Sequence, residues 1–244
     1  MKYTLKILRG DKAKQYFEEF ELEFIEGANI VSALLKLQKN PINKKGEKVT
    51  PVSFEIGCLE EVCGACSMLI DSKPRQACTA LIKPLLKDKS TITIAPLSKF
   101  EVIKDLVVDR SSMFKQLKKV NAWIEDSENK KIDPKTRDDL YELSKCMSCG
   151  VCLEACPNVN DRNDFIGPAA VSQTKLFTKH PLSKNKEKRM NVMLSKEGVS
   201  NCGNSQNCKA ACPKEIPLTE SIVEMQKEAN KYFLKRIFKN KKTD

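Results

Sequence analysis

The chain has 244 residues, of which 41% are hydrophobic and 31% charged, and a formal net charge of +11. This length allows one or two domains with real cores, and no apolar run approaches the roughly 20 residues that a transmembrane helix needs. Residues 1–4 lead straight into a strand-like pattern and give no secretory signal. We therefore expect a cytoplasmic protein whose eleven cysteines are metal ligands and not disulfides.

The surplus of positive charge is compatible with several kinds of partner. Nucleic acid, an anionic lipid surface or an acidic partner subunit would each suit a surplus of Lys and Arg. It also fits a chain whose lysines only keep it in solution. Composition alone therefore leaves the kind of partner open.

The first hundred residues show the alternation of half-buried strands together with one amphipathic helix. Asn29 is a good N-cap for that helix, which should end at Asn40 and Pro41. The expected strands are residues 3–8, 17–24, 68–70, 77–79 and 91–94, the third and fourth forming a hairpin. Strands with a helix across them indicate a small α+β domain, which we place at residues 1–104.

In residues 105–244 the apolar residues are spaced as on one face of a helix, and we expect an all-α domain here. Asp133 and Pro134 are typical of a helix start. Ser221 and Glu224 suggest a capping box at the start of the last helix. The helices are expected at residues 112–123, 135–145, 169–178, 186–195 and from 217 onward.

The last helix carries an apolar stripe made by Ile222, Met225, Ala229, Phe233 and Ile237. We expect such a stripe to pack in the core, with docking to a partner subunit as the alternative. The basic tail at residues 239–242 is expected to be a solvated end.

The first group of cysteines has the plant-type 2Fe–2S spacing. Cys58, Cys63 and Cys66 lie in one loop, and Cys78 follows after the hairpin. We assign these four thiolates to a 2Fe–2S cluster in a ferredoxin-like β-grasp domain, with backbone N–H groups turned toward the sulfurs. A zinc knuckle is the alternative, but its ligands usually come as two close pairs.

Two further runs share one spacing, in which a cysteine precedes a proline at the end of each run. The first run is Cys146, Cys149, Cys152 and Cys156, and the second is Cys202, Ser205, Cys208 and Cys212. In two-cluster ferredoxins the last cysteine of such a run ligates the other cluster. We therefore assign Cys146, Cys149, Cys152 and Cys212 to a 4Fe–4S cluster, and Cys156, Cys202 and Cys208 to a second cluster in a bacterial-ferredoxin-like domain.

Ser205 stands where the second run should have a cysteine. A hydroxyl ligates iron poorly, so three thiolates favour a 3Fe–4S cluster at this site. A 4Fe–4S cluster with Ser205 or water on the fourth iron is the alternative. Four, four and three thiolates account for all eleven cysteines.

No nucleophile–base pair, paired acids or nucleotide-binding loop stands beside these cysteines. Three different one-electron centres without a substrate site indicate a protein that conducts electrons between partners. A zinc-dependent nucleic-acid-binding module is the alternative from another class.

The order of the three sites resembles the iron–sulfur subunit of succinate dehydrogenase and fumarate reductase, with the menaquinone-linked Gram-positive type the most similar. The resemblance runs over residues 3–238 and is most specific at residues 58–68, 73–81, 105–110, 144–152 and 202–208. It implies an oxidoreductase subunit of respiratory complex II, in the tricarboxylic acid cycle and the respiratory chain. The related alternative is the iron–sulfur subunit of another flavoenzyme, such as a thiol-linked fumarate reductase.

The resemblance also implies partners. Electrons would pass from the FAD of a flavoprotein subunit through the 2Fe–2S, 4Fe–4S and 3Fe–4S clusters to quinone, or in reverse. The quinone and haem b would belong to a membrane anchor, and this subunit would be peripheral on the cytoplasmic face. Ubiquinone-type members carry a Trp and a His that are replaced here, where Asn158 follows Pro157 and Gly203 follows Cys202. We therefore assign no residue of this chain to a quinone site.

Overall fold

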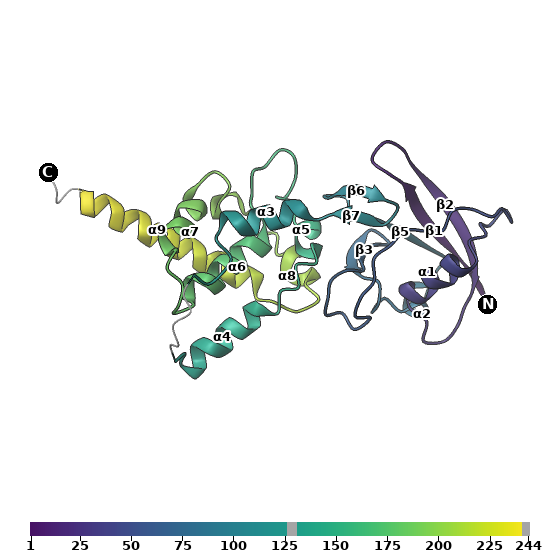
Figure 1. The fold of residues 1–244 in the computed structure, drawn as a ribbon, viewed down its shortest axis with the longest axis horizontal. Helices are drawn as coiled ribbons and strands as arrows, with labels where there is room; N and C mark the ends of the chain where they lie inside the picture. The colour runs from purple at the N-terminus through teal and green to yellow at the C-terminus, as the bar shows by residue number, and fades with distance from the viewer. Residues whose placement is uncertain (126–130, 241–244) are drawn as a thin grey trace. The chain divides into compact units, whose positions relative to one another are not determined.

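The computed structural model describes residues 1–125 and 131–240, with the side chains of the last two left out. It divides into two compact units (Figure 1). The first unit holds Met1–Arg110 together with Cys149–Glu154, and the second holds Ser111–Ser148 and the chain from Ala155 onward.

The first unit is built on a five-stranded sheet in the order β2-β1-β5-β3-β4. Its strands are β1 (Lys2–Gly10), β2 (Gln15–Glu23), β3 (Ser67–Ile70), β4 (Lys73–Gln76) and β5 (Thr91–Ala95). β1 pairs antiparallel with β2 and parallel with β5, whereas β3 is antiparallel to both β4 and β5. The alternating pattern buries one face, including Leu5, Ile7, Ile92 and Ile94. The α+β prediction is confirmed.

Helix α1 (Ile30–Lys39) covers this buried face and begins as predicted. The side chain of Asn29 accepts a hydrogen bond from the backbone N–H of Ser32 (2.9 Å), and the Ser32 hydroxyl accepts one from the Asn29 N–H (3.0 Å). This reciprocal pair satisfies two N–H groups that the first turn would leave unpaired. A second short helix, α2 (Ile82–Leu85), follows the cysteine region.

The hairpin of β3 and β4 forms with its second strand earlier than residues 77–79, where we expected it. Its turn has only two residues, Asp71 and Ser72, both with positive φ (50° and 63°). Such a tight turn suits the twist of the strands and starts the second strand at once. Ala77, Cys78 and Thr79 therefore leave the sheet after β4.

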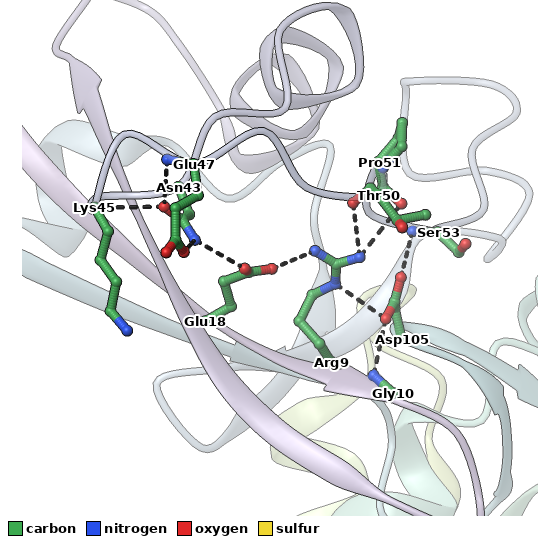
Figure 2. Close-up of polar contacts among 10 residues, drawn as sticks. All are labelled: Arg9, Gly10, Glu18, Asn43, Lys45, Glu47, Thr50, Pro51, Ser53 and Asp105. Carbon is green, nitrogen blue, oxygen red and sulfur yellow. Dashed lines mark hydrogen bonds and ion pairs between the residues drawn. The ribbon is translucent and has the colours of Figure 1, made fainter.

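A second sheet of two strands, β6 (Glu101–Lys104) and β7 (Val107–Asp109), was not expected from the sequence. Asp105 lies in its turn and is 2% exposed. Its carboxylate accepts hydrogen bonds from Arg9 Nε (3.0 Å) and from the backbone N–H groups of Gly10 and Ser53 (both 2.9 Å), as Figure 2 shows. Arg9 also pairs with Glu18 (2.6 Å), so one buried network joins the two sheets to the loop before the first cysteine.

The second unit is helical, as predicted. Its elements are α3 (Ser111–Lys119), α4 (Pro134–Ser144), α6 (Pro168–Lys179), α7 (Lys186–Leu194), a 3₁₀ turn (Val199–Asn201), α8 (Asn207–Ala211) and α9 (Leu218–Asn240) (Figure 1). Asp133 caps α4 by accepting from the Thr136 N–H (2.9 Å). α9 packs along α6 and α7 over a core that includes Val171, Met190 and Met225.

The predicted capping box of the last helix is wrong. α9 already begins at Leu218, directly after Pro217, so Ser221 lies inside the helix. The Ser221 hydroxyl donates to the Pro217 carbonyl (2.7 Å), and Glu224 instead forms ion pairs with Lys175 (2.9 Å) and Lys179 (2.5 Å). Because α9 packs against α6, Glu224 forms ion pairs with two lysines of α6 and does not cap its own helix.

The predicted core stripe of α9 is correct only for its first half. Ile222, Met225 and Ala229 are buried, but Phe233 and Ile237 are exposed. Residues 241–242 of the predicted solvated tail lie outside the described residues. No helix in the described ranges is long and apolar enough to cross a membrane.

Candidate metal centres

The loop before β3 directs its backbone N–H groups at the thiol of Cys58. This sulfur accepts from the N–H groups of Glu60 (3.4 Å), Val62 (3.2 Å) and Cys63 (3.3 Å). These hydrogen bonds stabilise the thiolate and lower the pKa of Cys58 to about 7. Cys63 is held in a similar way, because its sulfur accepts from the N–H groups of Cys58 (3.4 Å) and Ala65 (3.5 Å).

The backbone needs unusual conformations to turn these groups inward. Leu59 (φ 62°), Glu61 (φ 56°) and Gly64 (φ 74°) all lie in the left-handed region. Non-glycine residues enter it only where the surroundings hold them there, and such residues gather at functional sites. Gly57 must also lack a side chain, because a Cβ there would lie 3.0 Å from Cys63 Sγ.

Arg110 fixes the far side of the same loop. Its Nη1 donates to the Gly64 carbonyl (2.8 Å), and its Nη2 donates to the Ala65 carbonyl (3.3 Å) and pairs with Glu55 (2.6 Å). The sequence offered no signal for this role beyond a basic residue after a short apolar stretch. The planar guanidinium suits it because it bonds several acceptors at once.

Cys66 and Cys78 occupy the buried side of this centre, at 4% and 5% exposure. Burial first, and then the neighbouring thiols of Cys66 and Cys58, raise the pKa of Cys78 to about 11. The Cys66 thiol donates to the side-chain oxygen of the fully buried Gln76 (3.6 Å). The structure therefore brings all four predicted residues of the first group together.

In the helical unit, Cys146 follows the end of α4, where the sequence placed it. Burial raises its pKa, and the charge of nearby Cys212 raises it further, while the backbone N–H of Ser148 opposes the shift. Ser148 again has a left-handed backbone (φ 51°). Cys146 and Cys212 thus lie within electrostatic range although they are far apart in the sequence.

Cys149 and Cys152 lie on a segment that packs on the first unit and includes most of α5 (Val151–Ala155). Gly150 has φ +85°, and a Cβ there would come 2.9 Å from Cζ of Phe100. The carboxylate of Glu154 accepts from the Ser98 hydroxyl (2.5 Å) and the Lys99 N–H (3.0 Å). These contacts, which the sequence did not reveal, fix both ends of the turn that carries the two cysteines.

Cys156, Cys202 and Cys208 come together in the second unit, as the spacing predicted. Burial first, then the charges of Cys156 and Cys202, raise the pKa of Cys208 to about 11. Cys156 and Cys208 are each 5% exposed. Ser205 is exposed and lies between two residues with left-handed backbone, Asn204 (φ 52°) and Gln206 (φ 61°).

The donors fit iron–sulfur groups. All eleven cysteines are described and are present as thiols, not disulfides. Within the described ranges, no three His, Cys, Asp or Glu side chains are arranged to hold one metal ion. Soft thiolates with backbone N–H groups directed at sulfur are the donor set that iron–sulfur clusters take.

Comparisons with known proteins agree with this donor set. The model of a 2Fe-2S iron-sulfur cluster binding domain matches residues 4–115, and that of a 4Fe-4S dicluster domain matches residues 142–216. The chain is similar in fold to a chain of the Mycobacterium smegmatis Sdh1 complex in the apo form, with a TM-score of 0.82, 21% identity, and coverage of 95% of this chain and 96% of that one.

Two curated relatives match nearly end to end. The fumarate reductase iron-sulfur subunit of Wolinella succinogenes is 27% identical over 92% of this chain and 96% of its own length. The succinate dehydrogenase iron-sulfur subunit of Bacillus subtilis is 49% identical over 95% of this chain and 94% of its own length. With such identity over both domains, the chain belongs to the family of succinate dehydrogenase and fumarate reductase iron–sulfur subunits.

Proposed function

We propose that this chain is the electron-transfer subunit of a succinate:quinone oxidoreductase. The proposal is supported by cysteines that lie within electrostatic range of one another, on a chain 49% identical to a succinate dehydrogenase iron–sulfur subunit. These are Cys78 with Cys66 and Cys58, Cys146 with Cys212, and Cys208 with Cys156 and Cys202. We assign the conversion of substrate to a partner subunit. The role of this chain is to hold cofactors that pass electrons between partner subunits.

We assign each cluster to its own set of thiolates. The 2Fe–2S cluster takes Cys58, Cys63, Cys66 and Cys78; the 4Fe–4S cluster takes Cys146, Cys149, Cys152 and Cys212; and the 3Fe–4S cluster takes Cys156, Cys202 and Cys208. When bound, these groups supply one-electron carriers of graded potential between a flavin and a quinone.

Backbone N–H groups around the first centre stabilise negative charge on the sulfur of Cys58. The N–H groups of Glu60, Val62 and Cys63 direct their positive ends at Cys58 Sγ. Because each hydrogen bond favours the more negative state of a ligand, the loop raises the potential of whatever metal group it holds. Arg110 keeps that loop in place through the Gly64 carbonyl.

We further propose the partners that the family implies: a flavoprotein subunit with FAD, and a membrane anchor with quinone and haem b. The subunit would be peripheral on the cytoplasmic face. Apolar side chains are exposed around the first cysteine loop, at Ile56, Leu59 and Val62. Such residues suit contact with another subunit, and we assign the flavoprotein to this side.

Anaerobic purification followed by metal analysis and EPR tests the proposal. About nine irons per chain are expected, from two, four and three in the clusters, with a 3Fe signal in the oxidised protein and a 2Fe signal after reduction. Zinc without iron would instead support a nucleic-acid-binding module. The co-purified complex should reduce quinone with succinate, and its failure to do so with all clusters present would favour a different flavoenzyme.

A further inference from the structure

The C-terminal end of α9 carries a group of apolar side chains that its own unit does not cover. The helix contacts the core through Met225 and Ala229, both fully buried, and last through the partly buried Tyr232. Beyond this point the large apolar side chains are exposed: Phe233 51%, Leu234 52%, Ile237 38% and Phe238 62%. We call these four residues the α9 apolar patch.

Helical spacing places the α9 apolar patch on one side of the helix. Phe233 and Ile237 lie four residues apart, as do Leu234 and Phe238, so the two pairs form adjacent rows. The exposed basic residues Lys235 and Arg236 lie on the opposite side of the helix from these two rows. This end of α9 is therefore amphipathic in its own right, with an apolar face that is separate from the core face of Met225 and Ala229.

Charge also changes along the helix. The acidic residues of its first half are each paired with a lysine: Glu220 with Lys209, Glu224 with Lys175, and Glu228 with Lys186. Residues 229–240 contain no Asp or Glu. Over the part of the chain that the structure describes, Lys235 and Arg236 have no acidic partner, so their charge faces outward.

We infer that this end of α9, residues 231–238, binds the surface of an anionic lipid bilayer. A helix with aromatic and aliphatic residues on one face and Lys and Arg on the other lies in the plane of the interface, with its apolar face among the acyl chains and its bases at the headgroups. A second copy of the chain is a poorer occupant, because two such ends would bring like charges together. The inference is independent of the proposed electron-transfer function.

Vesicle co-sedimentation of the full chain tests the inference. The protein should sediment with vesicles of phosphatidylcholine and phosphatidylglycerol, much less with phosphatidylcholine alone, and less at high salt. Leu234→Ser and Phe238→Ser should each lower partitioning roughly tenfold, because each removes an apolar side chain from the interface. Lys235→Gln together with Arg236→Gln should lower it about thirtyfold, since each base contributes to attraction by the anionic surface.

Matched controls lie earlier on the same helix. Val223 is 49% exposed, so Val223→Ser and Lys227→Gln remove the same kinds of side chain and should leave partitioning unchanged. A Phe238→Trp variant should show a blue shift of its fluorescence with anionic vesicles. Unchanged iron content in every variant shows that the fold is intact.

Four results would overturn the inference. The first is the absence of sedimentation with anionic vesicles, and the second is equal sedimentation of all variants. The third is dimerisation that Phe238→Ser abolishes, which would assign the α9 apolar patch to a second copy of the chain. The fourth is sedimentation only when the vesicles contain the anchor subunit, which would assign the patch to a protein partner.

Discussion

Replacing Asp105 with alanine should destabilise the first unit strongly. Asp105 is 2% exposed and accepts from Arg9 Nε, Gly10 N–H and Ser53 N–H. Its removal leaves the buried Arg9 with Glu18 and the Thr50 carbonyl (2.8 Å), and leaves two backbone donors without their acceptor. Breaking a buried ion pair costs about 3–5 kcal/mol, and we expect a loss of that size.

The visible circular dichroism of the 2Fe–2S centre is a suitable assay, because Ser53 lies only five residues before Cys58. Asp105→Ala should lose this signal at a lower urea concentration than the wild type, and Asp105→Asn should fall between the two because its amide oxygen still accepts. Asp139→Ala, on the exposed side of α4, is the control and should change nothing.

The pH dependence of the Asp105→Ala effect follows from the carboxyl pKa. Burial raises the pKa of Asp105, but the hydrogen bonds from Gly10 and Ser53 and the charge of Arg9 outweigh it and hold the pKa below 3.8. A carboxyl group whose pKa is lower in the folded state than in the unfolded state stabilises the protein at pH values above its unfolded-state pKa. This stabilisation is lost as the pH falls through the folded-state pKa. The deficit of Asp105→Ala should therefore stay constant from roughly pH 8 to 5.5. A loss below about 1 kcal/mol, or a deficit that varies across this range, would refute the reasoning.

Three further substitutions test the centres themselves. Ser205→Cys should replace the 3Fe EPR signal by that of a second 4Fe–4S cluster, and an unchanged signal would remove the support for grouping Cys156 with the second run. Gly57→Ala should lower 2Fe–2S occupancy, measured as iron per chain, because its Cβ would lie 3.0 Å from Cys63 Sγ; full occupancy would contradict the packing argument. Arg110→Lys keeps the charge but loses the planar guanidinium group. The free energy of unfolding of the first unit should fall by about 1–3 kcal/mol, so that the 2Fe–2S signal disappears at a lower urea concentration while the 3Fe signal is unchanged.

Local chemistry made much of the structure predictable. Alternation placed β1 and β2, and the Asn29 cap placed the start of α1. Cysteine spacing grouped the thiols because ligands of one cluster must lie close together whatever the intervening chain does. Even the long-range association of Cys146 with Cys212 followed from the two related runs.

Contacts between distant segments that carry no cysteine motif were not predictable. Arg9 and Asp105 are separated by 96 residues, and nothing near either residue indicates the other. The fixing of the cysteine loop by Arg110 depends on β7, which is too short to have a clear period of its own. The capping box failed for a related reason, since the local pattern was satisfied but Glu224 found two lysines on α6.

Asn29 shows how the fold and the first centre depend on each other. Its side-chain oxygen accepts from the Ser32 N–H (2.9 Å) and so caps α1, while its amide nitrogen donates to the carbonyl of Cys78 (2.8 Å). Cys58, Cys63 and Cys66 lie in one short loop, whereas Cys78 is more distant in the sequence and needs a tertiary contact to reach them. Asp or Ser would cap the helix as well as Asn, yet neither has an amide group, whose oxygen accepts the cap bond while its nitrogen donates a second hydrogen bond. The asparagine therefore couples the packing of α1 on the sheet to the position of the fourth thiol, and this is a physical reason for the 2Fe–2S loop to sit on this α+β fold.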